Sequence, residues 1–255
     1  MSEVATTRRS GTTQRRVERA VRILEAAAEL VLRWGYDKTT IDDVARRAGV
    51  AKGTIYLHWG SREELFAALM RWDRAELVGA VRRQLRADPA SATLPGLFGH
   101  LAREIHRRPL LRAAMVQDSE VLGKLVRRKR TGSTTATELV EPFQKYLDTL
   151  REHGMSRPDL TPQDHLTVLA AVLYGSMASQ QALPETFRVS DDRQGELIGD
   201  TLERAFGTGR APSKEALDAC AVATYEYLDR ANEIARAKLQ ESLGDDLPPE
   251  EGPTS

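Results

Sequence analysis

The chain has 255 residues, more than one compact core usually serves, so two domains are expected. Its 41% apolar and 29% charged residues are typical of a globular protein and exclude a collagen-like or wholly disordered chain. The single cysteine, Cys220, excludes an intramolecular disulfide and a multi-thiolate zinc site. Residues 1–16 lack a secretory signal, and the longest mostly apolar stretch, 166–174, is far shorter than the roughly 20 residues of a membrane span. We therefore expect a cytoplasmic protein with no membrane partner.

Charge is divided unequally along the chain, although the formal net charge is zero. Residues 1–62 hold 12 basic and seven acidic residues, a net charge of +5, and the remainder holds 25 basic and 30 acidic residues, a net charge of −5. A small basic module joined to a larger acidic one favours a polyanion partner for the first part. A solvated basic face would give the same count, so charge alone does not decide the partner.

Helical periodicity runs through the chain, and strand signals are nearly absent, which predicts an all-α fold. The first helix is expected over residues 15–34, where apolar residues recur at helical spacing until Gly35. Thr40 with Asp43 resembles a capping box at the start of a short second helix, and Gly49 ends that helix. Helices after the first are predicted at residues 41–48, 50–59, 61 through 77, 94–107, 110–130 with a break, 135–153, 162–182, 192–206 and 213–242.

The second and third helices form the strongest motif. Two short helices joined by the tight turn Ala48-Gly49-Val50 and packed on a longer preceding helix are typical of a helix-turn-helix, whose second helix can enter a DNA major groove. Ile55 and Trp59, four residues apart, can face the core. The exposed side would then carry Lys52, Gly53, Thr54, Tyr56 and His58.

Residues 22–70 resemble the DNA-binding domain of TetR-family transcriptional regulators, over about a fifth of the chain. The resemblance is carried by Ile23-Leu24-Glu25-Ala26-Ala27, Gly35-Tyr36, Thr39-Thr40-Ile41, Ala45, Ala48-Gly49-Val50, Lys52-Gly53-Thr54-Ile55-Tyr56, Trp59 and Ser61-Arg62-Glu63-Glu64-Leu65. It implies a ligand-responsive regulator, a repressor that binds a palindromic operator in double-stranded DNA as a homodimer and is released by a small-molecule effector. Beyond residue 70, only the helicity of the chain matches the family.

The resemblance implies DNA contacts at Thr40, Lys52, Gly53, Thr54, Tyr56, His58 and Arg62. Lys52 suits a guanine edge or a phosphate, whereas Tyr56 falls where the family contacts the phosphate backbone. Leu57 departs from the family, which often has a polar residue there, so the base-reading surface is smaller or Leu57 contacts a thymine methyl group. The arginines of residues 1–16 either reach DNA or stay solvated.

The resemblance also implies an effector pocket and a dimer interface in the second part of the chain. Candidate ligand-binding residues are Phe98, His106, Met115, Gln117, Phe143, Tyr146 and Tyr174. Candidate interface residues are Ala171, Gly175, Ala178, Ala182, Leu197, Thr201 and Leu202. The aromatic candidates could equally be ordinary core, and the small-residue ridge could equally pack inside one subunit.

These expectations divide the chain into a basic flexible arm (1–15), a helix-turn-helix DNA-binding domain (16–62), a helical effector-binding and dimerisation domain (63–243) and an acidic disordered tail (244–255). An enzyme is disfavoured because the chain has no Gly-rich phosphate loop, His-Glu-x-x-His zinc site or Gly-x-Ser-x-Gly elbow. Neither a cofactor nor a bound metal is expected. The alternative function is an architectural or effector-independent DNA-binding protein, which the size of the second part disfavours.

Overall fold

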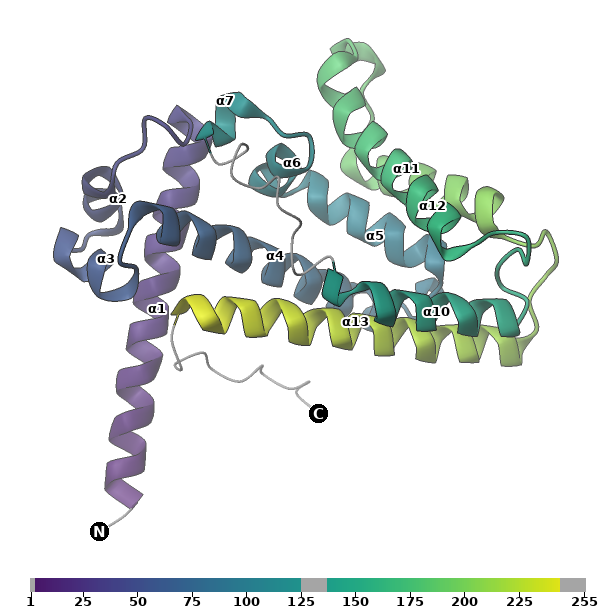
Figure 1. The fold of residues 1–255 in the computed structure, drawn as a ribbon, viewed down its shortest axis with the longest axis horizontal. Coiled ribbons are helices and arrows are strands. Elements are labelled where there is room, and N and C mark those ends of the chain that lie inside the picture. The colour runs from purple at the N-terminus through teal and green to yellow at the C-terminus, as the bar shows by residue number, and fades with distance from the viewer. Residues whose placement is uncertain (1–2, 125–136, 244–255) are drawn as a thin grey trace.

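The computed structural model describes residues 3–124 and 137–243, and the regular structure within these ranges is helical throughout, which confirms the predicted fold class (Figure 1). Two 3-10 turns lie at Pro89–Ser91 and Glu185–Phe187. The helices are α1 (Glu3–Trp34), α2 (Ile41–Ala48), α3 (Lys52–His58), α4 (Arg62–Ala87), α5 (Leu94–His106), α6 (Pro109–Met115), α7 (Ser119–Leu122), α10 (Val140–Glu152), α11 (Pro162–Ala182), α12 (Asp191–Phe206) and α13 (Lys214–Leu243). The predicted acidic tail, 244–255, lies outside the described residues.

Helix α1 begins earlier than predicted, whereas the break predicted within 110–130 is present. Helix α1 begins at Glu3, so residues that the sequence assigns to an arm are the first turns of a long helix. That stretch contains no proline and only one glycine, Gly11, and the propensity of its residues allows the helix to continue. The break expected within 110–130 lies between α6 and α7, where Gln117 adopts a left-handed φ of 54°.

The N-terminal helices α1, α2 and α3 and the first half of α4 form one hydrophobic core, which we call the head. Its centre contains Ile23, Leu24, Ile55 and Leu65, all with 0% of their surface exposed. This close packing sets the orientation of the short helices α2 and α3 against the long ones. Because α3 has only seven residues, packing rather than intrinsic propensity keeps it helical.

A second core, which we call the body, joins the rest of α4 to α5, α6 and α10 to α13. Helices α5 and α12 cross at Gly99 and Gly195. A Cβ atom added to Gly99 would lie 2.9 Å from the carbonyl oxygen of Gly195, and one added to Gly195 would lie 2.8 Å from that of Gly99. The two backbones therefore approach more closely than any larger residue would allow. In the described ranges, no helix is both long and apolar enough to cross a lipid bilayer.

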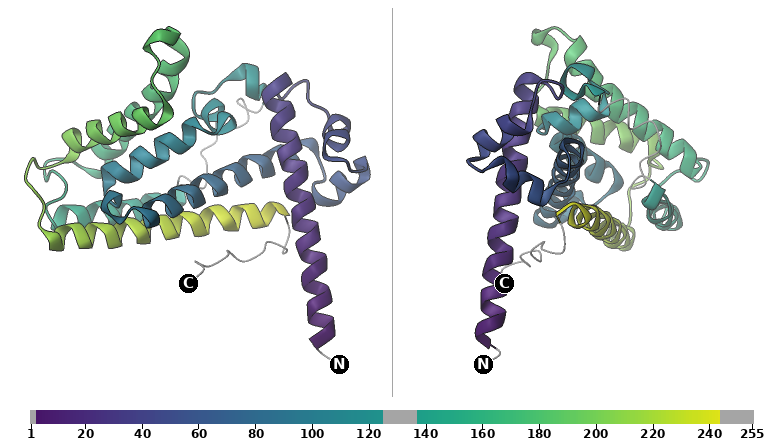
Figure 2. Two further views of the ribbon diagram at one scale, coloured as in Figure 1. Left: turned by 180° about the vertical axis from the view of Figure 1, so that it is seen from behind. Right: turned by 60° about the vertical axis from the view of Figure 1, so that its left-hand side comes forward.

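Helices α4 and α13 belong to both cores. They run side by side in opposite directions, and α1 crosses the end of the pair where α4 begins and α13 ends (Figures 1 and 2). Along the pair, Arg82 Nε donates to Asp229 Oδ1 at 2.5 Å and the Tyr225 hydroxyl donates to the Leu85 carbonyl at 3.0 Å. Leu239, in the last turns of α13, is buried in the core of the head. The position of the head is thus fixed by helices that also build the body.

Candidate nucleic-acid interface

Helix α2 begins with the capping box that the sequence predicts. The Thr40 hydroxyl accepts the Asp43 N–H at 3.2 Å, and the Asp43 carboxylate accepts the Thr40 N–H at 3.3 Å. The Thr40 hydroxyl also donates to Asp43 at 2.6 Å, and these bonds lower the pKa of the Asp43 carboxyl. Thr40 is exposed, but its hydroxyl proton is already engaged, so a phosphate at this position would compete with Asp43.

The turn between α2 and α3 depends on Gly49. Its φ of 66° lies in the left-handed region, where glycine carries no Cβ penalty. The N–H of the next residue, Val50, donates to the Ala45 carbonyl at 3.0 Å, which closes the end of α2. Helix α3 then starts at Lys52, after Ala51.

Helix α3 has one buried side and one exposed side. Ile55 is fully buried and Trp59, its C-cap, is 2% exposed, as the spacing predicts. On the other side Tyr56 is 46% and Leu57 79% exposed, and Lys52 and Gly53 are also open to solvent. Thr54 and His58 are half-buried, and the His58 ring lies 5.2 Å from that of Trp59. The exposed side therefore presents Ala51, Lys52, Gly53, Tyr56 and Leu57.

Lys52 forms an ion pair within the head that the sequence did not reveal. Its ammonium group lies 2.8 Å from Asp42 Oδ2 at the start of α2, and this hydrogen bond raises the pKa of Lys52. The side chains are 51% and 65% exposed, respectively, so the pair contributes little to stability. Lys52 can therefore exchange Asp42 for another anion at small cost.

Arg62, which is predicted to contact a phosphate, packs against the loop between α1 and α2. Its guanidinium group lies 3.9 Å from the centre of the Tyr36 ring. It also donates to the Tyr36 carbonyl and, at 2.9 Å, to the Thr39 carbonyl. Arg62 thus joins the start of α4 to the loop between α1 and α2, and its half-buried side chain has its donors directed into the head.

The same loop also contacts α7. The Tyr36 N–H donates to the Val121 carbonyl of α7 at 2.8 Å. A Cβ atom on Gly35, whose φ is 80°, would lie 2.6 Å from the Glu120 carbonyl oxygen. This close approach fixes the end of α1 against α7 and so helps to set the direction in which α3 faces.

Comparison with known proteins identifies this arrangement. Residues 23–69, which contain the whole helix-turn-helix, match the model of the tetR family of bacterial regulatory proteins. The helix-turn-helix of this chain is therefore similar to that of tetR-family regulators. Its relatives are transcriptional regulators, not enzymes.

Two curated relatives indicate how far the similarity extends. The HTH-type transcriptional repressor AcnR of Corynebacterium glutamicum is 24% identical over 148 residues, which cover 53% of this chain and 79% of AcnR. The HTH-type transcriptional activator FasR of Mycolicibacterium smegmatis is 38% identical over 78 residues, which cover 31% of this chain and 36% of FasR. The stronger identity is therefore found over a shorter part of the chain.

Solved structures share the fold. A candidate transcriptional regulator from Streptomyces coelicolor superposes with a TM-score of 0.53 at 23% identity, covering 72% of this chain and 96% of its own. A candidate TetR-family regulator from Rhodococcus sp. gives a TM-score of 0.55 at 18% identity, covering 74% of this chain and 98% of its own. The similarity reaches well beyond the helix-turn-helix, so the body shares the fold of these structures as well.

The structure brings together only some of the residues predicted to bind an effector. The Phe143 ring lies 6.2 Å from the rings of both Phe98 and Tyr146, and Tyr227, which sequence reasoning missed, lies 5.5 Å from Tyr146. The Tyr146 hydroxyl lies 3.0 Å from the Thr224 hydroxyl, and burial raises the pKa of Tyr227 to about 12. These aromatic residues form a buried cluster of the body, joined across α5, α10 and α13.

The other predicted effector residues have varied surroundings. His106 is 4% exposed, burial lowers its pKa, and within the described ranges its Nε2 has no hydrogen-bond partner. Met115 is half-buried at the edge of the core of the body. Gln117 is exposed in the break before α7, and Tyr174 is 51% exposed on α11. Gln117 and Tyr174 thus lie on the protomer surface, outside the buried aromatic cluster.

Most residues predicted for the dimer interface share an open face on α11 and α12. Their exposed members are Ala171, Gly175, Ala182, Leu197 and Thr201, and Ala178 is half-buried. Leu202 is a correction, because it is 0% exposed and packs in the core of the body. Helical spacing pointed to Leu202, but α12 turns that side toward α5. Tyr174, 51% exposed, extends the open face along α11.

The position of Arg62 leads to a prediction about stability. Replacing Arg62→Ala removes two charge-assisted hydrogen bonds to loop carbonyls and should lower the free energy of unfolding by about 2 kcal/mol. Arg46→Ala is the matched control, because that side chain is 76% exposed and its loss should change stability little. Denaturant unfolding measures both. Weaker DNA binding at unchanged stability would instead assign Arg62 to the DNA contact.

Proposed function

We propose that this regulator binds a palindromic DNA operator as a homodimer, through the exposed side of α3, and that a small-molecule effector releases it. The observation that carries the proposal is the division of α3 into a buried anchor, Ile55 with Trp59, and an open side that holds Lys52 and Tyr56. A lysine suits guanine edges or phosphates, and a tyrosine hydroxyl can bind a phosphate. We place the protein in the cytoplasm, together with its DNA.

Gly53 supports a close approach of DNA to α3. A glycine within a helix costs about 1 kcal/mol relative to alanine. Here an added Cβ atom would meet nothing within 4 Å, so the packing of the protomer does not require glycine. A partner outside the protomer that approaches the backbone closely would explain the residue. We therefore include Gly53 and the neighbouring Thr54 in the proposed contact surface, with Thr40 and His58 at its edge.

The dimer is proposed from two features. A seven-residue helix offers few base contacts, so useful specificity requires a second copy on a second half-site. The open face of α11 and α12 combines the exposed apolar groups Tyr174 and Leu197 with the small residues Ala171 and Gly175, which allow close helix packing. We propose that this face pairs with its copy across a two-fold axis.

The effector is proposed to bind within the body. The buried Nε2 of His106 supports this, because a buried polar atom without a partner favours a ligand that supplies one. We propose that the regulator represses transcription, because AcnR, which aligns with more than half of this chain, is named a repressor. FasR is named an activator, so a reporter assay is needed to decide between repression and activation of transcription.

The pairing of Lys52 with Asp42 leads to two variants with opposite effects on DNA binding. Lys52→Ala should weaken binding to a duplex selected from random sequence by about tenfold, because a cation that contacts DNA is lost. Asp42→Asn should tighten binding, because it frees Lys52 and removes a negative charge from the interface. Fluorescence anisotropy over a range of salt concentrations measures both.

The control for these DNA measurements is Lys145→Ala, which removes an exposed lysine of the body and should leave affinity unchanged. If Lys52→Ala and Asp42→Asn shift the affinity in the same direction, or not at all, the proposed placement of α3 on DNA is wrong.

The open face of α11 and α12 leads to a prediction about assembly. A carboxylate in the middle of a helix interface would be buried without a partner, so Tyr174→Glu should convert a dimer into a monomer. Val222→Glu is the control, because Val222 is 58% exposed on α13, outside this face, and the variant should stay dimeric. Light scattering gives the masses. A wild-type monomer, or a Tyr174→Glu variant that remains dimeric, contradicts the proposed interface.

A further inference from the structure

Three exposed arginines lie on one side of the first half of α1. Arg15, Arg19 and Arg22 follow the spacing i, i+4 and i+7, so they are neighbours on the surface of the helix. All three are exposed, and within the described ranges none of them forms a hydrogen bond or an ion pair. We call these three residues the arginine stripe. Their charges are available to an anionic partner.

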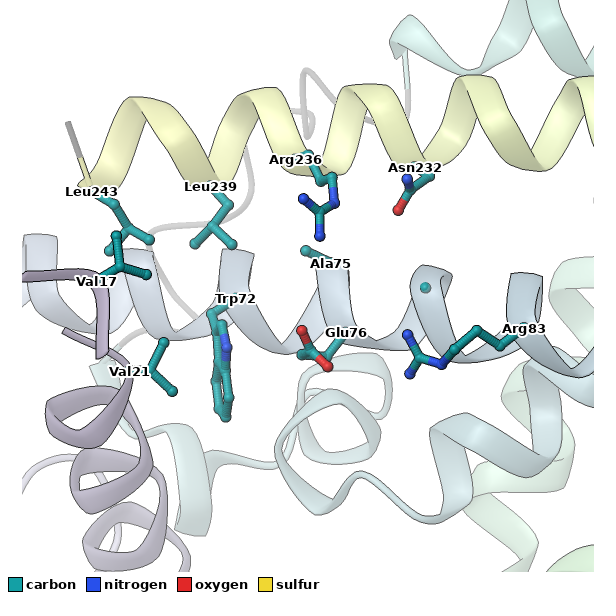
Figure 3. Close-up of a pocket in the computed structure, with 11 residues that line it drawn as sticks. Val17, Val21, Trp72, Ala75, Glu76, Arg83, Asn232, Arg236, Leu239 and Leu243 are labelled. Carbon is teal, nitrogen blue, oxygen red and sulfur yellow. The ribbon is translucent and has the colours of Figure 1, made fainter. Parts of the chain in front are cut away.

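The other side of this stretch is packed against the protein. Val17 is 8% exposed, and Ala20 is 1% exposed and belongs to the core of the head. Val17 and Val21 also line a pocket between α1, α4 and α13 (Figure 3). The arginine stripe therefore lies on a packed part of α1 and not on a free end. Because the backbone is already ordered there, a partner need only order the arginine side chains.

The arginine stripe lies on the side of α1 that contacts the helix-turn-helix. Glu29 of α1 forms an ion pair with Arg47 of α2. Arg22 precedes Glu29 by seven residues and Arg15 precedes it by 14, about two and about four helical turns, so all three share one side. From there α1 runs on past α3 toward its N-terminal end (Figures 1 and 2). The stripe thus extends the surface of the helix-turn-helix along α1.

The direction of α1 places the arginine stripe on the outer side of the proposed dimer. Helix α11, which carries part of the proposed dimer face, lies at the top of all three views in Figures 1 and 2, and the N-terminal end of α1 lies at the bottom. The views differ by rotation about the vertical axis, so the two elements are separated in space along that axis. With a second copy paired at α11, the stripe lies far from the two-fold axis, beyond α3.

The charge and the length of the stripe both fit a DNA backbone. Residues 15–25 hold four arginines and only two glutamates, Glu18 and Glu25, so a positive excess remains after both carboxylates are counted. From Arg15 to Arg22 the helix rises by about 10 Å. One strand of B-DNA presents about three phosphates over that length, because its phosphates are about 3.4 Å apart along the axis. Three arginines can therefore meet three phosphates.

We propose that the arginine stripe binds the DNA backbone outside each half-site. Each protomer then contacts its half-site through α3 and the flanking phosphates through α1. Contacts to phosphates carry no sequence information, so the flanking DNA adds affinity and salt dependence and not specificity. This inference rests on the proposed function, because it requires that α3 holds the protein on DNA.

Two duplexes test the flanking contact with the full chain. One is the selected palindrome alone, and the other carries about ten further base pairs of arbitrary sequence, one helical turn, at each end. The wild type should bind the longer duplex at least about tenfold more tightly at low salt. The triple variant Arg15→Gln, Arg19→Gln, Arg22→Gln should bind both duplexes as the wild type binds the short one. Glutamine has nearly the helix propensity of arginine, so the variant should fold.

Salt dependence provides a second measurement. Each phosphate contact adds about 0.9 to the slope of log affinity against log salt concentration. With three arginines in each of two protomers, the slope on the longer duplex should be steeper by about five for the wild type than for the triple variant. The matched control removes three exposed positive charges from α10 and α13 of the body, through Lys145→Gln, Lys214→Gln and Arg230→Gln, and should behave as the wild type does.

The outcomes separate this inference from the proposed function. Equal affinity of the wild type for the two duplexes, or a preference for the longer duplex that the triple variant keeps, overturns the flanking contact alone. Weaker binding of the triple variant to the short duplex also overturns it, because the arginines would then act within the half-site. If the wild type binds neither duplex, the proposed function is wrong and the flanking contact is wrong with it.

Discussion

The structure depends on the pairing of α4 with α13, because both helices belong to both hydrophobic cores. Helix α4 starts under the helix-turn-helix and ends deep in the body, and α13 returns along it to the head (Figure 1). Close packing makes such shared helices stiff, so a displacement at one end is felt at the other. The contact of α7 with the loop after α1 adds a further support for the head.

This arrangement places the boundary between the two parts inside a helix rather than between helices. The division at residue 62 that the sequence suggests falls at the first residue of α4, yet Leu65, Phe66 and Leu69 of α4 lie in the core of the head. A head cut away before α4 would lose these apolar contacts, whose burial is worth roughly 2 kcal/mol for each large side chain. We therefore regard the first half of α4 as part of the DNA-binding domain.

Local patterns predicted local structure well. The capping box of Thr40, the left-handed turn at Gly49 and the buried pair Ile55 and Trp59 all depend on residues close in sequence, so spacing and residue type were enough to find them. Contacts between residues that are distant in sequence could not be predicted in this way. Asp42 and Lys52 are ten residues apart, and Arg62 meets a carbonyl 26 residues away, so no helical periodicity connects these partners.

Prediction from the sequence meets the same limit in the body. A sequence of amphipathic helices predicts which residues are apolar, but not which side of α12 faces α5, and Leu202 was placed on the wrong side for this reason. The aromatic residues Phe98, Phe143 and Tyr146 did converge, but Tyr227 of α13 joined them unpredicted. The pocket between α1, α4 and α13 combines segments up to 226 positions apart, from Val17 to Leu243, and only the folded chain reveals it.

The central claim is that two copies of α3 enter successive major grooves on one face of a DNA duplex. A hydroxyl-radical footprint of the protein on its selected duplex tests this most directly. The account predicts two equal protected patches, related by the two-fold symmetry of the sequence and separated by about one helical turn, roughly 34–36 Å, or a multiple of it. A single patch, or two patches on opposite faces of the duplex, would contradict it.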